Sequence, residues 1–586
     1  MKPRILTLFL VVVLLGTACG SAPAATNPPG PADGTGSTAT INASVQYRSL
    51  PLKIYRQKMM AGWLGQMVGV SYGAPTEFRA LGHLLPEEAV PELVPGLANN
   101  AYSQDDLYVE MTFLKTLETY GLDVPIIQAG VDFANSEYEL WHANKAGRDN
   151  LRNGIAPPNS GHPIYNAHAD DIDYQIESDF AGLISPGLPN RAIRLGETFG
   201  SLMNYGDGLY AGQFMSCMVA EAFFENDPQK LVEAGLACIP AQSQYAEAIR
   251  DVLAGWQSDP ADWQKTWTLI TDKYLKDPAY RRFSCHDEYF TSTDFDIDAK
   301  INGAYVVLGL LYGQRDIPST MLIAMRSGQD SDCNPSSAAG VLFTTIGFAD
   351  LPGLYTDGLN QDGYFSYTGY SYKRLVEVSE ELARQSVIAA GGRIETDENG
   401  EEVFLIPIQT PVPSAFVQSW APGPITESVF NAQELEQLVH SQTNLEPDIS
   451  EFAPGWRVQD CSNDPMLGLK DKILGREKVL ITLPLDDTIP CRLVSSLTLP
   501  ETLHKGLHLV VGHYIYSQWF LVVMANSDEI LRQEVSPDFS TDGWMDVTVD
   551  LSAYAWKTIQ LELWNLASGY GNGGAYWGLI ELVDRP

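Results

Sequence analysis

Residues 326–340 read RSGQDSDCNPSSAAG and bring two carboxylates to the start of a predicted helix. Asp330 and Asp332 lie one residue apart in the loop, and Asn334 is a typical helix cap. Residues 336–340 are small, so another backbone can approach them closely. One expectation is a hard divalent cation, which prefers carboxylate oxygens as ligands. The other is an acidic, well-capped surface loop, because short acidic motifs are common.

A second stretch, residues 53–78, reads KIYRQKMMAGWLGQMVGVSYGAPTEF. Its apolar residues recur at helical spacing, which predicts a helix. Glycines at positions 62, 65, 69 and 73 fall on one side of it. Each costs about 1 kcal/mol in a helix interior relative to alanine. Four on one face therefore predict close packing against another helix. Glu77 follows just past the helix, where simple solvation is the alternative to a role in a site.

The segment YSQDDLYVEMTFLKTLETYG, residues 102–121, predicts another helix. Asp105 and Asp106 open this helix, where the helix dipole favours negative charge, so capping alone is one explanation. Glu110 comes four residues after Asp106 and shares its face. Like charges on one face are unfavourable unless a cation neutralises them.

A further acidic segment is HADDIDYQIESDFAGLISPGLPN, residues 168–190. Read as one helix, it places Asp170, Asp173 and Glu177 in a stripe that contains no lysine or arginine. The alternative is a solvated acidic face. A Gly-Asp-Gly turn that contains Asp207 then begins a largely apolar helix.

The chain changes character at residue 391. A β-hairpin is predicted around Asn399-Gly400, and a Pro-rich connection follows. From residue 446, eight short β-branched runs predict a β-sandwich. The fold class is therefore multidomain, an all-α bundle followed by an all-β sandwich. The predicted boundaries are 1–19 for a signal peptide, 20–45 for a flexible linker, 46–390 for the helical domain, 391–445 for the hairpin and connector, and 446–586 for the sandwich.

Charge and the N-terminus restrict partners and location. The 586 residues carry a formal net charge of −36, which argues against a nucleic-acid partner. Lys2 and Arg4 precede an apolar run over residues 5–15, as in a secretory signal peptide. Cys19 ends a sequence that resembles a bacterial lipobox. We expect an exported protein, either a cell-surface lipoprotein anchored in the bacterial cell membrane through lipidated Cys19 alone, or a secreted one.

The cysteines show no CxxC pair, so the sequence carries no zinc-ribbon signal. Cys461 and Cys491 lie in the same C-terminal region and are candidates for a disulfide. Cys217, Cys238 and Cys285 are predicted to be buried thiols, whereas Cys333 lies within the acidic loop.

Four motifs, in order between about residues 55 and 353, resemble the ADP-ribosylglycohydrolase family. They are GQMVGVSYGAPTEF, similar to its opening helix; QDDLYVEMTF, similar to its first metal motif Thr-Asp-Asp-Thr; ESDFAGLISPG, similar to its Gly-rich segment; and SGQDSDCNPSSAAGVL, similar to its second metal motif Asp-x-Asp-Thr. The resemblance implies an orthogonal helical bundle that binds divalent ions and cleaves a glycosidic bond at the anomeric carbon of a ribose. The C-terminal strands resemble a galactose-binding-like jelly roll.

The resemblance also implies which residues form the site. The implied metal ligands are Asp105, Asp106, Asp330 and Asp332, with Gln104 and Cys333 at two further ligand positions. We expect Glu77, and then Glu177 and Asp173, to be the catalytic carboxylates that do not bind metal, and the sequence does not assign which is acid and which is base. The remaining candidates, for substrate contact, are Glu110, Asp170, Asp207 and Asn334. One or two ions are expected, with Mg²⁺ favoured and Mn²⁺ or Ca²⁺ as alternatives.

Four departures from the family pattern affect this site. Gln104 stands where the family has Ser or Thr, Cys333 and Leu107 stand where it has Thr, and Val70 replaces a frequent Asp. A Gln amide oxygen still suits a hard cation, whereas a thiolate suits Mg²⁺ poorly and Leu cannot ligate. One ion, or a different ion, is therefore an alternative to two Mg²⁺.

Export separates this chain from the ADP-ribosylated proteins inside its own cell. We therefore expect a divalent-metal-dependent glycoside hydrolase acting on an N- or O-linked furanoside or related extracellular glycan. One alternative is true hydrolysis of ADP-ribosyl-protein or ADP-ribose. The other is a surface glycan-binding lipoprotein without catalysis. A carbohydrate or ADP-ribosyl substrate is the expected partner, and no obligate protein partner is evident.

Overall fold

The computed structural model describes residues 45–280, 297–439, 445–462, 467–485, 489–499, 505–513, 518–526, 528–540, 542–555, 557–568 and 573–584. The predicted signal peptide with Cys19, the linker up to residue 44, and Cys285 lie outside these ranges. Within them, every helix is too short or too polar to cross a bilayer.

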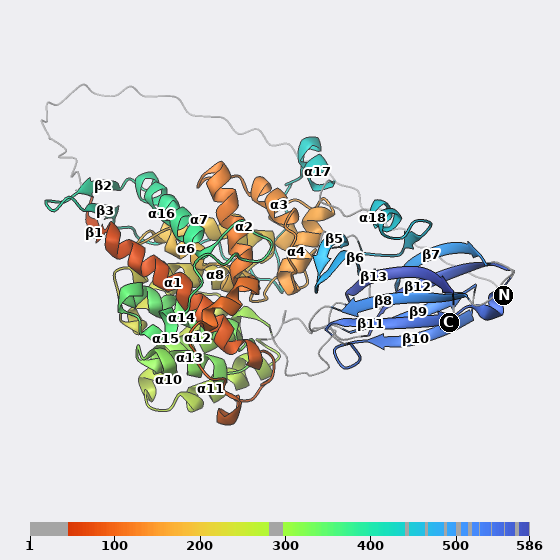
Figure 1. Cartoon of the computed structure of the whole chain (residues 1–586). Helices are drawn as coiled ribbons and strands as arrows, with labels where there is room; N and C mark the ends of the chain where they lie inside the picture. Colours follow the sequence, from red (N-terminus) through yellow and green to blue (C-terminus); the bar gives the residue numbers. More distant parts are fainter. Residues whose placement is uncertain are drawn as a thin grey trace, which may run out of the picture. The chain divides into compact units, whose positions relative to one another are not determined.

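Helices dominate the first part of the chain, as predicted (Figure 1). They are α1 (Leu52–Gly73), α2 (Asp105–Tyr120), α3 (Ile126–Ala134), α4 (His142–Arg152), α5 (Asp173–Ile176), α6 (Asp179–Leu183), α7 (Pro189–Phe199), α8 (Asp207–Ala222), α9 (Pro228–Ala237), α10 (Gln244–Ser258), α11 (Trp263–Ile270), α12 (Ala299–Gly313), α13 (Ile317–Arg326), α14 (Cys333–Ile346), α15 (Gly353–Thr356) and α16 (Tyr372–Ala389).

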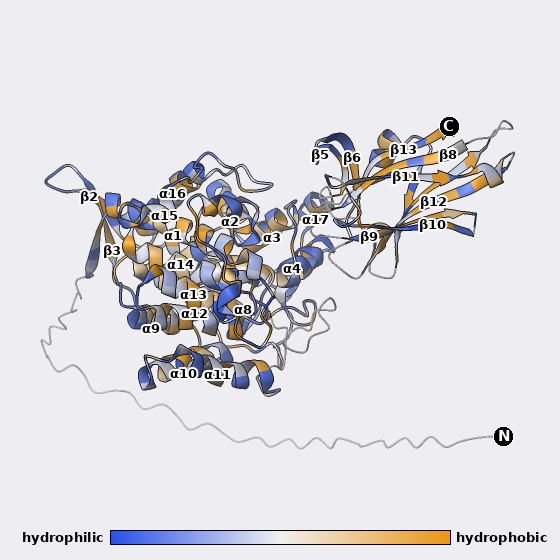
Figure 2. Cartoon of the chain, turned by 60° about the horizontal axis from the view of Figure 1, so that its bottom comes forward, coloured by the Kyte–Doolittle hydropathy of each residue, from blue (hydrophilic) through white to orange (hydrophobic). Residues whose placement is uncertain are grey.

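Helices α1 and α14 pack side by side in this bundle, and both contribute to its hydrophobic interior (Figures 1 and 2). The glycine face of α1 makes this contact, as the sequence predicted. A Cβ atom on Gly65 would lie 2.3 Å from the carbonyl oxygen of Ala339, and one on Gly69 would lie 2.3 Å from that of Pro335. No real side chain tolerates such distances, so the two backbones touch only because these α1 residues are glycines.

A small sheet joins the beginning of the helical part to its end. Its strands, in the order β1-β3-β2, are β1 (Tyr47–Pro51), β3 (Glu402–Pro407) and β2 (Arg393–Thr396). Strands β2 and β3 form the predicted hairpin, and Gly400 adopts a φ of +83° in its turn. The sequence analysis did not foresee β1, which pairs antiparallel with β3 along its whole length.

The Pro-rich connection after β3 lies against the helical bundle. Tyr210 on α8 donates a hydrogen bond from its hydroxyl to the carbonyl of Ala415 (2.7 Å). Asn159 accepts one from the backbone N–H of Thr426 (2.9 Å) and donates one to its carbonyl (3.0 Å). The connection then enters α17 (Ala432–Val439). The residues up to 439 thus belong physically with the bundle.

Two antiparallel sheets form the C-terminal part. One has the order β10-β9-β12-β7-β4 and the other β11-β8-β13-β6-β5. Helix α18 (Leu445–Phe452) precedes β4 (Arg457–Gln459), β5 (Gly468–Ile473), β6 (Arg476–Thr482), β7 (Cys491–Thr498), β8 (Lys505–His513), β9 (Trp519–Ala525), β10 (Asp528–Val535), β11 (Trp544–Asp550), β12 (Thr558–Ala567) and β13 (Ala575–Asp584).

The sandwich has hydrophobic cores of its own, distinct from that of the bundle. Trp577 is completely buried in one core, where its ring centroid lies 5.4 Å from that of Trp519. Trp544 and Tyr576 are also buried. These aromatic residues therefore pack in the interior of the sandwich.

The disulfides partly correct the sequence analysis. Cys461 and Cys491 form the predicted bond. Cys217 on α8 and Cys238, directly after α9, also form a disulfide, so the prediction that they are thiols is wrong. Their separation of 21 residues gave no spacing signal, and only the antiparallel packing of α8 and α9 brings them together. Among the described cysteines, Cys333 is the free one.

Candidate metal centre and active site

Hydrogen bonds join the acidic loop before α14 to the segment that follows α1. The backbone N–H of Phe78 donates to the carbonyl of Gln329 (3.2 Å), and the hydroxyl groups of Thr76 and Ser331 lie 2.9 Å apart. These bonds bring the loop beside Glu77, although about 250 residues separate the two segments in the sequence.

Gly73, the last glycine of α1, allows the acidic loop to lie directly against the helix. A Cβ atom on Gly73 would lie 2.2 Å from the Cα of Asp332. The chain enters the loop through Gly328 and Gln329, whose φ angles are +86° and +57°. Gly328 therefore follows α13 in the left-handed conformation that glycine favours.

Asp105 and Asp106 begin α2, as predicted, and face the same loop. The thiol of Cys333 donates a hydrogen bond to Oδ2 of Asp106 (3.2 Å). The first turn of α14 thereby meets the first turn of α2. The two acidic motifs, far apart in sequence, form one cluster with Glu77.

Three buried carboxylate oxygens in this cluster lack a protein partner. Oδ1 of Asp106, of Asp330 and of Asp332 each have no hydrogen bond to any described residue. A buried acceptor without a partner costs roughly 1–3 kcal/mol. A divalent cation satisfies such oxygens, and carboxylate oxygen is the ligand type that Mg²⁺, Mn²⁺ and Ca²⁺ take. The residues therefore fit the metal that the sequence implied.

The protonation behaviour of the cluster agrees with this fit. Burial raises the pKa of Asp106 and Asp330 well above the usual range, and neighbouring carboxylates, including Asp332, raise both further. Burial and Asp332 raise the pKa of Asp105 to about 7. The protein groups alone therefore disfavour a fully ionised cluster, whereas a bound cation would favour it.

The side chain of Cys333 contacts the cluster in its protonated thiol form. Burial, followed by the charges of Asp106, Asp330 and Asp332, raises its pKa well above the usual range. Since only the thiolate is a good metal ligand, the geometry favours a hydrogen-bond donor to Asp106 over the ligand role that the resemblance implied. Gln104, the other substituted ligand position, is the N-cap residue of α2 and is partly exposed.

Glu77 is the carboxylate of this cluster with an exposed side chain. Crowding by protein atoms, and then the charges of Asp332, Asp105 and Asp106, raise its pKa. Access to water moderates that rise. A carboxylate that touches both the cluster and solvent is suited to orient and deprotonate a water molecule.

Asp173 and Glu177 border the cluster from α5 and its C-terminus. Burial and Asp173 raise the pKa of Glu177 well above the usual range, and Asp105 contributes as well. Asn144 donates a hydrogen bond to Oε1 of Glu177, and Oε2 has no partner among the described residues. Asp173 accepts from the backbone N–H groups of Ala143 (3.2 Å) and Asn144 (2.9 Å), and burial raises its pKa to about 6.

The single helix expected over the acidic segment is wrong. The chain forms two short helices, α5 and α6, with Glu177 and Ser178 between them. Glu177 has a φ of −112° and a ψ of 18°, outside the helical region, so the predicted stripe of three carboxylates does not exist.

Asp170 and Asp207 belong to a different buried cluster. Lys300 on α12 lies 2.5 Å from Asp298 and 3.9 Å from Asp170. Burial raises the pKa of Asp207 to about 6, and the charge of Lys300 limits this rise. The cation that the acidic segment lacks in sequence comes from a helix about 130 residues away. These contacts give Asp170 and Asp207 a structural explanation, and their predicted contact with substrate stays untested.

Two further predicted residues are engaged by the protein itself. Glu110 accepts from Nε2 of Gln66 (2.5 Å) and from the backbone N–H of Phe180 (2.6 Å), so it links α1, α2 and α6. Asn334 makes no capping bond to α14, which contradicts the predicted cap; its amide donates to Oδ1 of Asn302 (3.1 Å) instead. Asp332 holds the N-cap position. The predicted substrate contacts of Glu110 and Asn334 stay predictions.

Two site residues were missed by the sequence analysis. Gln66 is a fully buried polar residue on the helix whose glycine face was recognised, and that contrast was the available signal. Asn144 holds Glu177 and, through its backbone, Asp173. Its position in an ordinary polar segment carried no signal.

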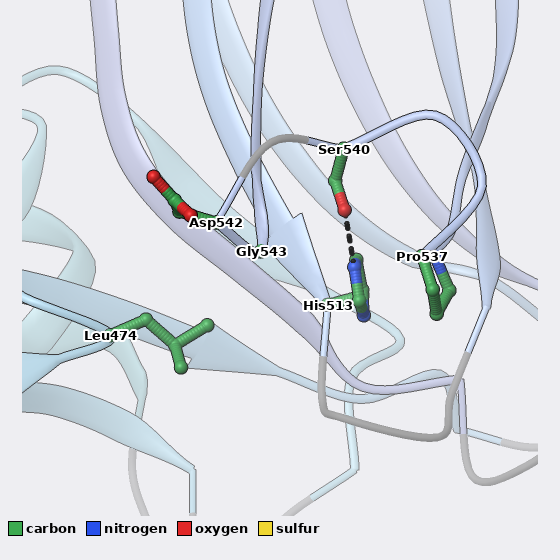
Figure 3. Close-up of a pocket in the computed structure, with 6 residues that line it drawn as sticks. All are labelled: Leu474, His513, Pro537, Ser540, Asp542 and Gly543. Atoms are coloured by element: carbon green, nitrogen blue, oxygen red, sulfur yellow. Dashed lines mark hydrogen bonds between the residues drawn. The ribbon is translucent and has the colours of Figure 1, made fainter.

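The sandwich contains a small cavity of about 300 Å³ (Figure 3). Its lining consists of Leu474, His513, Pro537, Ser540, Asp542 and Gly543. His513 and Ser540 are joined by a hydrogen bond of 2.8 Å. None of the described lining residues is Trp, Tyr or Phe, the side chains on which sugars usually stack, so glycan binding by the sandwich stays a prediction.

A sequence model of the ADP-ribosylglycohydrolase family matches residues 51–391, more than half of the chain. With the helical bundle and the acidic cluster, this match defines the class of protein, a hydrolase of the glycohydrolase type. The chain belongs to the ADP-ribosylglycohydrolase family.

Solved structures similar to this chain include an "ADP-ribosylglycohydrolase-related protein complex", with 15% identity and a TM-score of 0.36, over 57% of this chain and 99% of that one. The others concern less than a quarter of the chain. A Stig cyclase from Fischerella sp. TAU shows 12% identity and a TM-score of 0.18 over 23% of this chain and 86% of that one. A cleaved adhesin domain of Lys-gingipain from Porphyromonas gingivalis shows 15% identity and a TM-score of 0.17, over 22% of this chain and 92% of that one. A search of curated proteins gave no match.

Proposed function

We propose that the protein is an exported, divalent-metal-dependent glycoside hydrolase that cleaves a furanoside or a related extracellular glycan at the anomeric carbon. One observation carries this proposal. Glu77 and four aspartates from two distant motifs converge, and three of their buried oxygens have no partner among the described residues.

Asp105, Asp106, Asp330 and Asp332 would hold the ion, with Gln104 at the edge of the site. When bound, the ion would orient vicinal sugar hydroxyls and stabilise charge as the anomeric carbon becomes oxocarbenium-like. Magnesium fits this set of oxygen ligands, and Mn²⁺ or Ca²⁺ are alternatives.

The chain's own carboxylates would supply acid and base. Glu177 is completely buried, and burial followed by the charge of Asp173 raises its pKa, which favours the protonated form. It would give this proton to the leaving group. Glu77, which is exposed, would take a proton from the attacking water. Asp173 would hold the first turn of α4, and with it Asn144, in place beside Glu177.

Hydrolysis of an ADP-ribosyl bond is the second candidate, because the family match favours it. The signal-peptide-like N-terminus supports the first candidate. We place the protein outside the cytoplasm, at the cell surface through a lipidated Cys19 or secreted. Extracellular glycans are the substrates available there.

The test combines metal analysis with a screen of sugars released from a panel of glycans, aryl furanosides and ADP-ribosyl substrates. Asp332→Asn should lower divalent-ion affinity and turnover by about 100-fold or more, since it removes the negative charge of a ligand carboxylate. The matched control is Asp362→Asn, an exposed aspartate paired with Lys373, which should change neither quantity.

Three outcomes would contradict the proposal. Unchanged turnover in Asp332→Asn would reject the site. Release of ADP-ribose with no sugar release from glycans would favour the second candidate. Glycan binding without metal binding or turnover would identify a non-catalytic surface lipoprotein.

A further inference from the structure

A cluster of different chemistry lies beside the acidic centre. His142 begins α4, and His168 and Asp171 lie in the turn before α5. One ring nitrogen of each histidine and one carboxylate oxygen of Asp171 all lie within 4.8 Å of one another. Nδ1 of His168 is 2.8 Å, and Nδ1 of His142 is 3.8 Å, from Oδ2 of Asp171.

We propose that His142, His168 and Asp171 form a second metal site, which takes a divalent transition ion such as Zn²⁺. Two imidazoles and one carboxylate form a donor set that zinc takes with a fourth position left open. Imidazole nitrogen favours zinc and its neighbours over Mg²⁺, so this site differs in selectivity from the all-oxygen cluster. The inference does not depend on the proposed glycosidase activity.

The distances suit such an ion. Zinc bonds of about 2.0–2.1 Å in a tetrahedron place ligand atoms roughly 3.3 Å apart. The separations of 2.8 and 3.8 Å from the Asp171 oxygen lie on either side of that value. The two imidazole rings lie next to each other without stacking, with centroids 5.5 Å apart and ring planes at 66°.

The backbone positions of the three residues are held by groups other than their own side chains. Asn166 donates to the carbonyls of Ala143 (3.1 Å) and Met203 (2.8 Å) and accepts from the backbone N–H of His168 (2.9 Å). Nδ2 of Asn204 likewise donates to the carbonyl of Asp171 (2.8 Å). Removing an imidazole should therefore leave the local backbone in place.

Exposure and backbone conformation also favour a binding role. The side chain of Asp171 is completely buried, whereas those of His142 and His168 retain 14% and 26% of their exposure. The two imidazoles therefore lie between solvent and the buried carboxylate of Asp171 in exposure. His142 has a φ of +42°, a left-handed conformation that is costly for a residue with a side chain and that clusters at functional sites.

A hydrogen-bonded histidine pair sharing one carboxylate is the simpler explanation of these contacts, and the experiment distinguishes the two. The full-length protein is stripped of metal, saturated with Mg²⁺, and titrated with Zn²⁺ or Co²⁺. We expect one equivalent of zinc to bind despite excess Mg²⁺. Bound Co²⁺ should show the strong visible absorption of a nitrogen-ligated ion with few ligands.

Variants assign the ion to this cluster. The double variant His142→Asn, His168→Asn should bind zinc at least about 100-fold more weakly, since ligands are lost. Asp332→Asn, in the acidic centre, should keep the zinc equivalent. His508→Asn is the matched control, because His508 also contacts two carboxylates, Asp546 (2.9 Å) and Glu581 (3.3 Å), but on the sandwich; it should leave the zinc affinity unchanged.

Several results would overturn the proposal. They are unchanged zinc affinity in the double variant, loss of the equivalent in Asp332→Asn, or displacement of zinc by Mg²⁺ from the unmodified protein. If the double variant does not fold, histidine modification by diethyl pyrocarbonate serves on the unmodified protein. Zinc should slow modification of His142 and His168, and equal rates with and without zinc would reject the site.

Discussion

At the scale of single residues, burial and charge decide the roles within the site. Glu77 and Glu177 are both glutamates beside the same aspartates, yet one is exposed and the other has no exposed surface. Burial by protein atoms and neighbouring carboxylates raise the pKa of both groups. In the proposed mechanism it is therefore the access of Glu77 to solvent that assigns it the base role and leaves the acid role to Glu177.

The pH dependence of turnover should report Glu177. Because burial and Asp173 raise its pKa, the protonated acid persists above the usual carboxyl range and is lost as the pH rises through the raised pKa. We expect kcat/KM to fall on the alkaline side. Glu177→Gln should lower kcat by about 100-fold or more and remove that fall. A pH profile with the same alkaline limb in Glu177→Gln would contradict the assignment.

Cys333 should be unreactive in the folded, metal-free protein. Its pKa is raised by burial and by the surrounding aspartates, so very little thiolate exists at pH 7–8. Iodoacetamide should modify it at least about 100-fold more slowly than it does in urea, as measured by mass spectrometry of the peptide. Fast alkylation at neutral pH would show that the thiol is ionised and able to serve as a ligand.

At the scale of elements, the packing of α1 against α14 brings the acidic segments of the site together. The two helices that pack through the glycine face also flank the acidic cluster. The C-terminus of α1 leads to Glu77, and the N-terminus of α14 directly follows Asp332. The packing distance between the helices therefore sets the distance between the acidic groups.

A methyl group on the glycine face should test this coupling. Gly69→Ala places a Cβ 2.3 Å from the carbonyl oxygen of Pro335, which is backbone and cannot rotate away. We expect a loss of about 1–3 kcal/mol in the free energy of unfolding of the bundle, from urea unfolding. Divalent-ion affinity should fall as well. Gly369→Ala is the control, because its Cβ would meet no atom within 4 Å; equal stability of both variants would refute the close packing.

At the scale of the whole molecule, the bundle and the sandwich have separate hydrophobic cores. The family match ends at residue 391, but the contacts of the bundle continue through Thr426 to α17. Folding of the bundle therefore involves the connector and not only the family segment.

Shortened chains should separate these parts. Residues 46–439 should retain the divalent-ion affinity of the full chain within about twofold, because the cluster and its supporting contacts all lie there. Residues 46–391 should be less stable by several degrees in Tm, since the connector bonds to Asn159 and Tyr210 are lost. Loss of ion binding in the longer of the two chains would show that the site needs the sandwich.

The sequence alone determined the class of each part and the two acidic motifs. Helical spacing, the glycine face and the order of four motifs are signals that the sequence carries by itself. The structure confirms the helices and the glycine contact, except over residues 168–190, where the chain forms two short helices. Only the tertiary structure decided which acidic residues meet. Lys300 reaches Asp170 from a distant helix, Asn144 holds Glu177, and the thiol of Cys333 faces Asp106, since each contact joins chain segments whose separation carries no periodic signal.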